Sequence, residues 1–307
     1  MPIQRKKHMK KLMFAAAAVA ACVAVADVTS ANIVGYMDSK TSGEECYVAQ
    51  TAVFRPISGA ATLKDLVAKA AEGDFQPGDF EIQLVGLDGS TAAVTEETMG
   101  AFCPDALEYE GEDLAFNYVE EMGGWFLTAD FASFSYEMND YPIPEGTGFF
   151  MYTHFDFDGA KIQNAGQVGK SYVDVTCPEN SYRLSGNIAP KDMTMGDFTA
   201  VNAVEGHDFQ PGGFEIQFLG DDGSTAVVSE ETMGAFCPDA LEYEGEDLAF
   251  NYVAEMGGWF LTADFASFSY EMNDYPVAAG RGFFLYTHFE YTDGVKVALP
   301  PAIEEDK

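Results

Sequence analysis

The chain contains two copies of one unit, and this repeat constrains the fold of the chain more than any other feature. Residues 97–142 and 231–276 are each 46 residues long and differ only at Glu120, which is replaced by Ala254 in the second copy. The offset of 134 residues continues without gaps over about residues 74–156. Because segments this similar adopt the same structure, any site in the shared block should occur twice.

The repeat predicts two tandem homologous domains, at residues 32–165 and 166–299, followed by a short acidic tail at residues 300–307. Each unit is 134 residues long, which is an ordinary domain size. Hydrophobic residues make up 47% of the chain and charged residues 21%, so each unit has enough apolar material for a core. This composition excludes intrinsic disorder.

Each unit has mainly the residue patterns of β-strands. Phe80, Ile82 and Leu84 alternate with polar residues, which is the period of a half-buried strand, and Asp88-Gly89 follows as a hairpin signal. Further strands are predicted at residues 91–94, 116–119, 124–128, 131–136 and 149–155. We therefore expect a mainly β fold, either a β-sandwich or a barrel-like sheet.

One short helix is also expected in each unit. In the first, Thr62 can cap a helix that has Asp65 three residues later and ends at Gly73. Thr194 and Asp197 repeat this cap in the second unit. The apolar residues of the first helix have helical spacing at Leu63, Leu66, Val67 and Ala70. A shorter helical turn is predicted around residues 96–101.

The first 26 residues have the pattern of a secretory signal peptide. An apolar run of about 15 residues ends in Ala24-Val25-Ala26 and is too short for a membrane-spanning helix, which needs about 20. It follows a basic head formed by Arg5, Lys6, Lys7, Lys10 and Lys11. Cleavage is expected after Ala26, with Ala31 as an alternative, and lipid attachment at Cys22 is a further alternative. The signal peptide predicts export to the periplasm, the cell surface or the medium. No other stretch could span a bilayer, so the mature protein is expected to be soluble or peripherally attached.

The charge of the chain excludes a general nucleic-acid binder. Asp and Glu number 50 against 16 Lys and Arg, a formal net charge of −34, whereas neutralising phosphates requires clustered basic residues. This charge favours cationic partners or divalent ions, and a solvated acidic coat is the simpler alternative. The sequence does not indicate the oligomeric state.

The ends of the first unit resemble a family of exported bacterial proteins. The segment Ala31-Asn32-Ile33-Val34-Gly35-Tyr36 is similar to the A-N-x-V-G-Y start of that family after its signal peptide. Gly146-Thr147-Gly148-Phe149-Phe150 is similar to its closing G-x-G-F-F strand. The second copy keeps the ending at residues 280–284 and departs at the start, where Lys170 replaces the tyrosine. The resemblance implies export and a β-rich fold, and it implies no chemistry.

Four cysteines remain after removal of the signal peptide, two in each unit. An even count in an exported protein favours disulfides, and the repeat favours the pairs Cys46–Cys103 and Cys177–Cys237. Free buried thiols, or a bridge between Cys103 and Cys237, are the alternatives. No C-x-x-C motif occurs, so the sequence does not support a zinc site or thioredoxin-like chemistry.

Two pairs of aromatic residues are candidates for ligand binding. His154 and His288 lie near the end of each unit, with Asp156 and Glu290 two residues later as candidate partners for proton transfer or metal binding. A strand histidine that is hydrogen-bonded to a neighbour is the alternative. Trp125 and Trp259 follow Gly-Gly and could present a flat ring to a sugar, or they could be core residues.

The densest acidic run is a candidate calcium site that also occurs twice. If the run is extended, alternate glutamates share one face, and a hard cation would relieve their repulsion. They are Glu108, Glu110 and Glu112 in the first copy and Glu242, Glu244 and Glu246 in the second. The run lacks the EF-hand pattern, and a solvated acidic loop is the alternative. Calcium is the only cofactor that the sequence indicates.

These patterns favour an exported, non-enzymatic protein with a structural or adhesive role on an extracellular surface. A carbohydrate-binding module protein, with or without calcium, is the alternative, and a secreted hydrolase is a third reading. The chain has no nucleophile elbow, metalloprotease, P-loop or dinucleotide motif. Two weak binding sites on one chain raise the avidity for a surface, which suits a duplicated adhesive protein.

Overall fold

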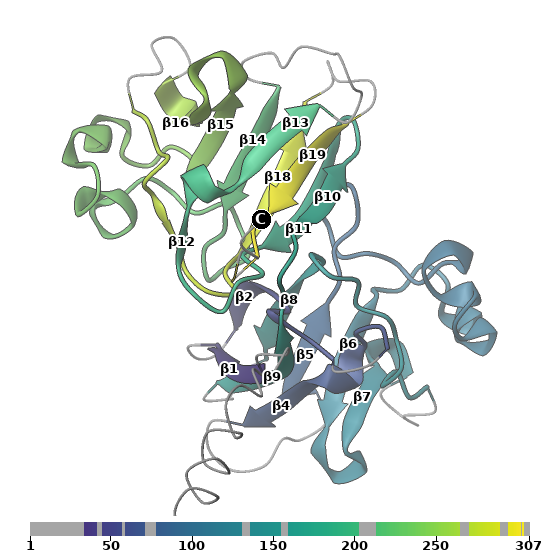
Figure 1. Ribbon diagram of the computed structural model, residues 1–307. Helices are drawn as coiled ribbons and strands as arrows, with labels where there is room; N and C mark the ends of the chain where they lie inside the picture. Colours follow the sequence, from purple (N-terminus) through teal and green to yellow (C-terminus); the bar gives the residue numbers. More distant parts are fainter. Residues whose placement is uncertain are drawn as a thin grey trace, which may run out of the picture. The chain divides into compact units, whose positions relative to one another are not determined.

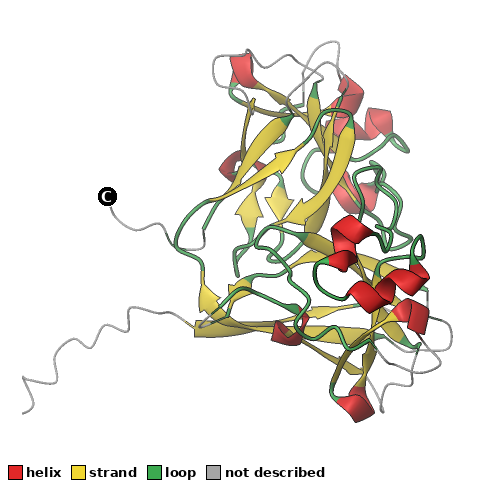
Figure 2. Ribbon diagram, turned by 90° about the vertical axis from the view of Figure 1, so that its right-hand side faces the viewer, coloured by secondary structure: helices red, strands yellow, loops and turns green. Residues whose placement is uncertain are grey.

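Antiparallel β-sheets joined by short helical turns make up the described part of the chain (Figures 1 and 2). This computed structural model describes residues 34–41, 45–56, 59–70, 78–130, 136–154, 159–202, 213–264, 270–288, 294–301 and 303. The prediction of a mainly β fold is confirmed. Residues Val34–Lys307 form one compact unit, and the two repeats are its two halves.

The largest element of each half is an open five-stranded sheet with the same strand order. In the first half the order is β2-β8-β5-β6-β7, with β2 (Cys46–Thr51), β5 (Phe80–Gln83), β6 (Ala115–Val119), β7 (Gly124–Leu127) and β8 (Gly148–Thr153). In the second half the order is β11-β18-β14-β15-β16, with β11 (Ser181–Gly186), β14 (Phe214–Phe218), β15 (Ala249–Val253), β16 (Gly258–Leu261) and β18 (Gly282–Thr287). The registers also match, since Ile82 pairs with Phe116 as Ile216 pairs with Phe250.

Smaller sheets complete each half. The first contains β1 (Val34–Lys40), β3 (Phe54–Arg55), β4 (Leu66–Ala70) and β9 (Ala160–Val168), with the other three strands all paired to β9. The second contains β10 (Val173–Cys177), β13 (Thr199–Asn202) and β19 (Val295–Leu299), and a two-stranded pair joins β12 (Met193–Thr194) to β17 (Pro276–Val277). The unit boundary predicted between residues 165 and 166 therefore lies inside β9.

The prediction of one helix over residues 62–73 is wrong beyond its first turn. The cap is present, because Asp65 Oδ2 accepts a hydrogen bond from Thr62 N at 2.9 Å, but the helix ends at Asp65 and the chain continues as β4. Leu66 and Ala68 are buried while Val67 is exposed, which is the period of a strand, and β4 pairs with β9. Tertiary pairing therefore outweighs the helical spacing in this segment.

Several short helical turns take the place of a single helix in each half. The 3-10 helices are η1 (Leu63–Asp65), η3 (Pro104–Tyr109), η4 (Glu120–Met122) and η5 (Thr128–Asp130), and in the second half η6 (Met195–Asp197), η8 (Pro238–Tyr243), η9 (Ala254–Met256) and η10 (Thr262–Asp264). The turn predicted around residues 96–101 is confirmed as a π-helix, η2 (Glu96–Gly100), and η7 (Glu230–Gly234) repeats it.

The predicted disulfides are wrong, because Cys46, Cys103, Cys177 and Cys237 form no disulfide. The sheet register shows that the two expected pairs are not equivalent. Cys46 pairs with Thr153, and Ser181 pairs with the equivalent Thr287, so the counterpart of Cys46 is Ser181. Cys177 instead ends β10, where Thr287 Oγ1 lies 3.1 Å from its Sγ atom. Similar spacing in the sequence therefore did not mean equivalent positions.

The two halves contact each other through the outer faces of their five-stranded sheets. Phe150, Leu184 and Phe284 form a buried cluster there. The backbone contacts are reciprocal: Tyr47 N donates to Asp221 O at 2.7 Å, and Tyr182 N donates to Leu87 O at 2.8 Å. Each half therefore supplies the same kind of contact to the other, as in a two-fold symmetric dimer.

Candidate functional site

A row of polar side chains on the outer face of the first sheet is centred on a buried carboxylate. Glu81 is only 4% exposed. Its Oε1 accepts a hydrogen bond from Gln83 Nε2 at 2.6 Å, and its Oε2 accepts one from Thr128 Oγ1 at 3.1 Å. Asn117, directly opposite Glu81 on β6, donates from Nδ2 to Thr128 Oγ1 at 2.9 Å. These hydrogen bonds compensate for the contacts with water that the carboxylate loses on burial.

His154, which follows β8, lies beside this carboxylate. Its Nε2 is 3.5 Å from Glu81 Oε2, and its ring packs edge-on against Tyr152 with the centroids 4.5 Å apart. The side chain remains 31% exposed. A histidine beside a carboxylate can exchange a proton with a ligand, but this carboxylate is already bound by neighbouring side chains. Asp156 and Glu290, the partners predicted for the two histidines, lie outside the described residues.

The second sheet repeats the same arrangement. Glu215 is 5% exposed, accepts hydrogen bonds from Gln217 Nε2 at 2.6 Å and from Thr262 Oγ1 at 3.1 Å, and its Oε2 lies 3.9 Å from Nε2 of His288. Asn251 Nδ2 donates to Thr262 Oγ1 at 2.8 Å. The polar row is therefore a property of the repeated unit.

A column of stacked tyrosines closes one end of each polar row. Tyr47 stacks on Tyr152 with ring centroids 4.2 Å apart, and burial raises the pKa of both phenols. Gly223 of the other half lies against the Tyr47 ring so closely that an added Cβ would stand 3.2 Å from Cγ of the ring. Tyr182 stacks on Tyr286 in the same way. The contact between the halves thus covers what would otherwise be an aromatic surface.

The hypothesis that Trp125 and Trp259 present a ring to a sugar is wrong, because both residues have no exposed surface. Trp125 Nε1 donates to Leu66 O at 2.8 Å, and Trp259 Nε1 donates to Phe198 O at 2.9 Å. Each indole therefore joins its five-stranded sheet to the strand that follows the capped turn. This hydrogen bond also fixes the point at which the predicted helix gives way to a strand.

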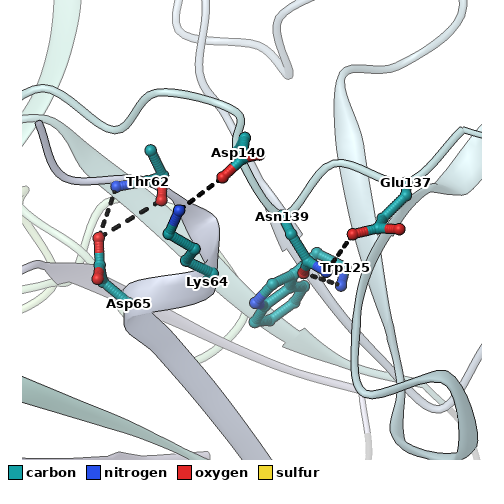
Figure 3. A network of polar contacts seen from close by, with 7 residues as sticks. All are labelled: Thr62, Lys64, Asp65, Trp125, Glu137, Asn139 and Asp140. Atoms are coloured by element: carbon teal, nitrogen blue, oxygen red, sulfur yellow. Dashed lines mark hydrogen bonds and ion pairs between the residues drawn. The ribbon is translucent and has the colours of Figure 1, made fainter.

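A pocket of about 240 Å³ lies next to Trp125, and Figure 3 shows the polar network around it. Asn139 Oδ1 accepts a hydrogen bond from Trp125 N at 3.0 Å, and Asn139 Nδ2 donates to Glu137 Oε1 at 2.7 Å. Lys64 Nζ lies 2.6 Å from Asp140 Oδ1 at the rim. The second half keeps the equivalent Asn273 and Glu271 contacts, but Gly196 stands in the place of Lys64.

The candidate calcium ligands do not share a strand face. Glu108 lies in η3, Glu110 caps its end, and Glu112 lies in the bend that follows; all three are exposed. The same holds for Glu242, Glu244 and Glu246, where η8 is the helix. Within the residues that the structure describes, no group of three or more His, Cys, Asp or Glu side chains is placed to hold a metal ion.

Glu108 and Glu242 each accept a hydrogen bond from a tyrosine hydroxyl at 2.8 Å. This bond, followed by partial burial, raises the pKa of Tyr136 and Tyr270 to about 12. An unfolded tyrosine ionises near pH 10. The bonds should therefore support the fold fully below pH 10, and their contribution should disappear as the pH rises from 10 to 12.

We expect the two phenols to remain protonated at pH 11, as measured by NMR of ¹³C-labelled tyrosine. The variants Glu108→Gln and Glu242→Gln should shift the titration of the adjacent tyrosine towards pH 10, while the unchanged copy serves as an internal control. Titration of Tyr136 and Tyr270 near pH 10 in the unmodified protein would contradict the expectation.

No helix in the described part of the chain is long and apolar enough to cross a membrane. Comparison with protein-family models, curated proteins and solved structures returned no match.

The carboxylate at the centre of the polar row was not among the residues predicted from the sequence. Its signal was present, because Phe-Glu-Ile-Gln occurs in both copies with alternating apolar and polar residues, which places Glu81 and Glu215 on the outer face of a strand. Only the fold reveals that the histidines lie beside these glutamates, since about 70 residues separate them in the sequence.

Proposed function

We propose that this protein is exported and has a non-enzymatic, structural or adhesive role, with two copies of one β unit presenting similar surfaces. One observation carries the proposal: the shared side chains best suited to chemistry make the same internal contacts in both copies. His154 lies beside Glu81 as His288 lies beside Glu215, and both indoles bond to the backbone. A repeat whose shared side chains stabilise the fold in both copies suits a protein that acts through its surface and not through catalysis.

The reciprocal contact between the halves supports this proposal. Two binding surfaces held in one unit engage a repetitive target together, because the second contact is intramolecular once the first has formed. The acidic charge keeps such a protein soluble and favours targets that carry cationic groups. The basic head and the apolar run before Ala26 support export.

Mass spectrometry of the protein recovered from a producing bacterium tests export. We expect a chain that begins at Asp27, or at Asn32 if the alternative site is used, in the fraction outside the cytoplasmic membrane. A lipid-modified chain beginning at Cys22 would support export with a different anchor. A full-length chain confined to the cytoplasm would refute export.

Retention on cell-envelope fragments tests the adhesive role. Beads carrying residues 27–307 should be retained more strongly than beads carrying an unrelated protein of similar charge. The double variant His154→Asn/His288→Asn should be retained equally, because these side chains serve the fold in this proposal. Release of soluble sugars or peptides by the protein, abolished in the double variant, would contradict the proposal and favour the hydrolase reading.

The pocket beside Trp125 favours glycan binding as a second candidate function. Its rim carries an amine, two carboxylates and an amide, which are groups that hydrogen-bond to sugar hydroxyls. The variant Lys64→Gly removes the amine from the rim, as Gly196 does at the equivalent position of the second half. Calorimetry with oligosaccharides, with and without calcium, should then show weaker binding for Lys64→Gly; equal binding by the variant would exclude this pocket.

A further inference from the structure

A second pocket, of about 210 Å³, lies where the two halves meet. The residues that line it in the first half are mainly aliphatic, and three residues of β11 complete it. They are Leu84, Val85, Leu87, Ala92, Thr98, Leu114, Tyr141, Thr147 and Gly148, with Tyr182, Arg183 and Leu184 from β11. None of the described residues that line this pocket is a carboxylate, although Asp and Glu number 50 in the chain.

The equivalent place in the second half is filled by the protein itself. At the offset of 134 residues, Phe218 replaces Leu84 and Arg281 replaces Thr147. Phe218 has no exposed surface, and the guanidinium carbon of Arg281 stands 4.3 Å from the centroid of its ring. Leu84 is instead only partly buried. These two substitutions accompany a filled position in the second half and an open one in the first. Four further lining residues, Val85, Leu87, Arg183 and Leu184, also differ from their counterparts Leu219, Asp221, Val48 and Ala49.

Two aromatic residues of the first half are equivalent to the ring pair that contacts Phe218 in the second. In the second half, Phe250 and Tyr275 lie 4.9 Å apart between centroids, and Phe218 packs within 5.4 Å of both. In the first half, the equivalent Phe116 and Tyr141 also lie 4.9 Å apart. Tyr141, which lines the pocket, is therefore the counterpart of a ring that packs against Phe218 in the second half.

We propose that this pocket binds a small, uncharged aromatic molecule of about one ring. The second half shows which group fits its counterpart, because the phenyl ring of Phe218, covered by the guanidinium of Arg281, occupies that place there. An apolar cavity of about 150 Å³ can bind benzene, so about 210 Å³ is sufficient for a substituted ring. Arg183 in the lining disfavours a cationic ligand, and the acidic charge of the chain disfavours an anionic one. This inference is independent of the structural or adhesive role.

Binding of 4-fluorophenol, followed by ¹⁹F NMR, tests the proposal directly. The unmodified protein should broaden or shift the probe signal in a saturable manner. The variant Leu84→Phe/Thr147→Arg, which copies the second half, should bind roughly tenfold more weakly or not at all. The reciprocal variant Phe218→Leu/Arg281→Thr should bind two probe molecules per chain.

Further variants keep the test informative if a double variant does not fold. Leu87→Asp copies Asp221, and because Leu87 is 54% exposed the substitution should place a charge at the rim without disturbing the core. It should weaken probe binding while the unfolding temperature remains unchanged. Saturable binding that none of these variants alters, or no saturable binding by the unmodified protein, would overturn the site. Equal binding of cyclohexanol would overturn the assignment to an aromatic ligand.

Discussion

Replacing Trp125 with alanine should lower the free energy of unfolding by about 3–5 kcal/mol, the usual cost of removing a large buried aromatic residue. The side chain has no exposed surface, packs against Phe80 and Tyr118, and donates its only hydrogen bond to the backbone of Leu66. Loss of the ring leaves a cavity and an acceptor without its donor. Urea unfolding, analysed by linear extrapolation, measures the change.

The second copy supplies the matched control for this prediction. Trp259→Ala removes the same contacts from the other half and should cost a similar amount. In the unmodified protein, both indoles should resist quenching by acrylamide. Strong quenching, together with a loss of less than about 1 kcal/mol in the free energy of unfolding for each variant, would show that the two rings are exposed. The hypothesis that they bind a sugar would then be supported again.

Substituting valine for both Gly148 and Gly282 should disrupt the contact between the halves and cost about 1–3 kcal/mol at each position. A Cβ atom on Gly148 would lie 2.7 Å from Leu184 Cγ, and one on Gly282 would lie 2.6 Å from the carbonyl carbon of Ala49. Gly148 begins β8 and Gly282 begins β18. Because each glycine lies against the backbone of the opposite half, the backbones of the two halves must separate to make room for a valine side chain. Urea unfolding measures the loss of stability, and small-angle scattering measures the separation.

An exposed residue provides the control for the glycine variants. Met256→Val changes a side chain that is 54% exposed and should alter the free energy of unfolding by less than about 0.5 kcal/mol. If Gly148→Val/Gly282→Val unfolds like Met256→Val and scatters like the unmodified protein, the close approach of the two halves is incorrect.

The strands could be predicted from the sequence because their signals are local. Phe80 and Ile82 alternate with Glu81 and Gln83. This pattern alone places the first pair on the core face of the strand and the second pair on its outer face. The helix after Thr62 could not be predicted correctly, because its apolar residues fit both periods. Pairing of β4 with β9, about 100 residues away in the sequence, decides between them.

The candidate site was harder to predict because it depends on contacts between distant segments. Glu81 and His154 have no common sequence motif, and their proximity results from the pairing of β5 with β8. The cysteine pairs failed for a related reason. A difference in length between residues 41–46 and 178–181 places Ser181, and not Cys177, opposite the threonine of the closing strand.

The positions at which the halves touch lie outside the nearly identical block, and several of them differ between the copies. Leu184 occupies the register position of Ala49, and Phe218 and Arg281 replace Leu84 and Thr147. A chain assembled from two first halves would lack the leucine that now fits against Gly148 and would leave both pockets open. Making the copies uniform would therefore leave the packing of the shared block almost unchanged but would alter the contact between the halves, where several positions of the two copies are not interchangeable.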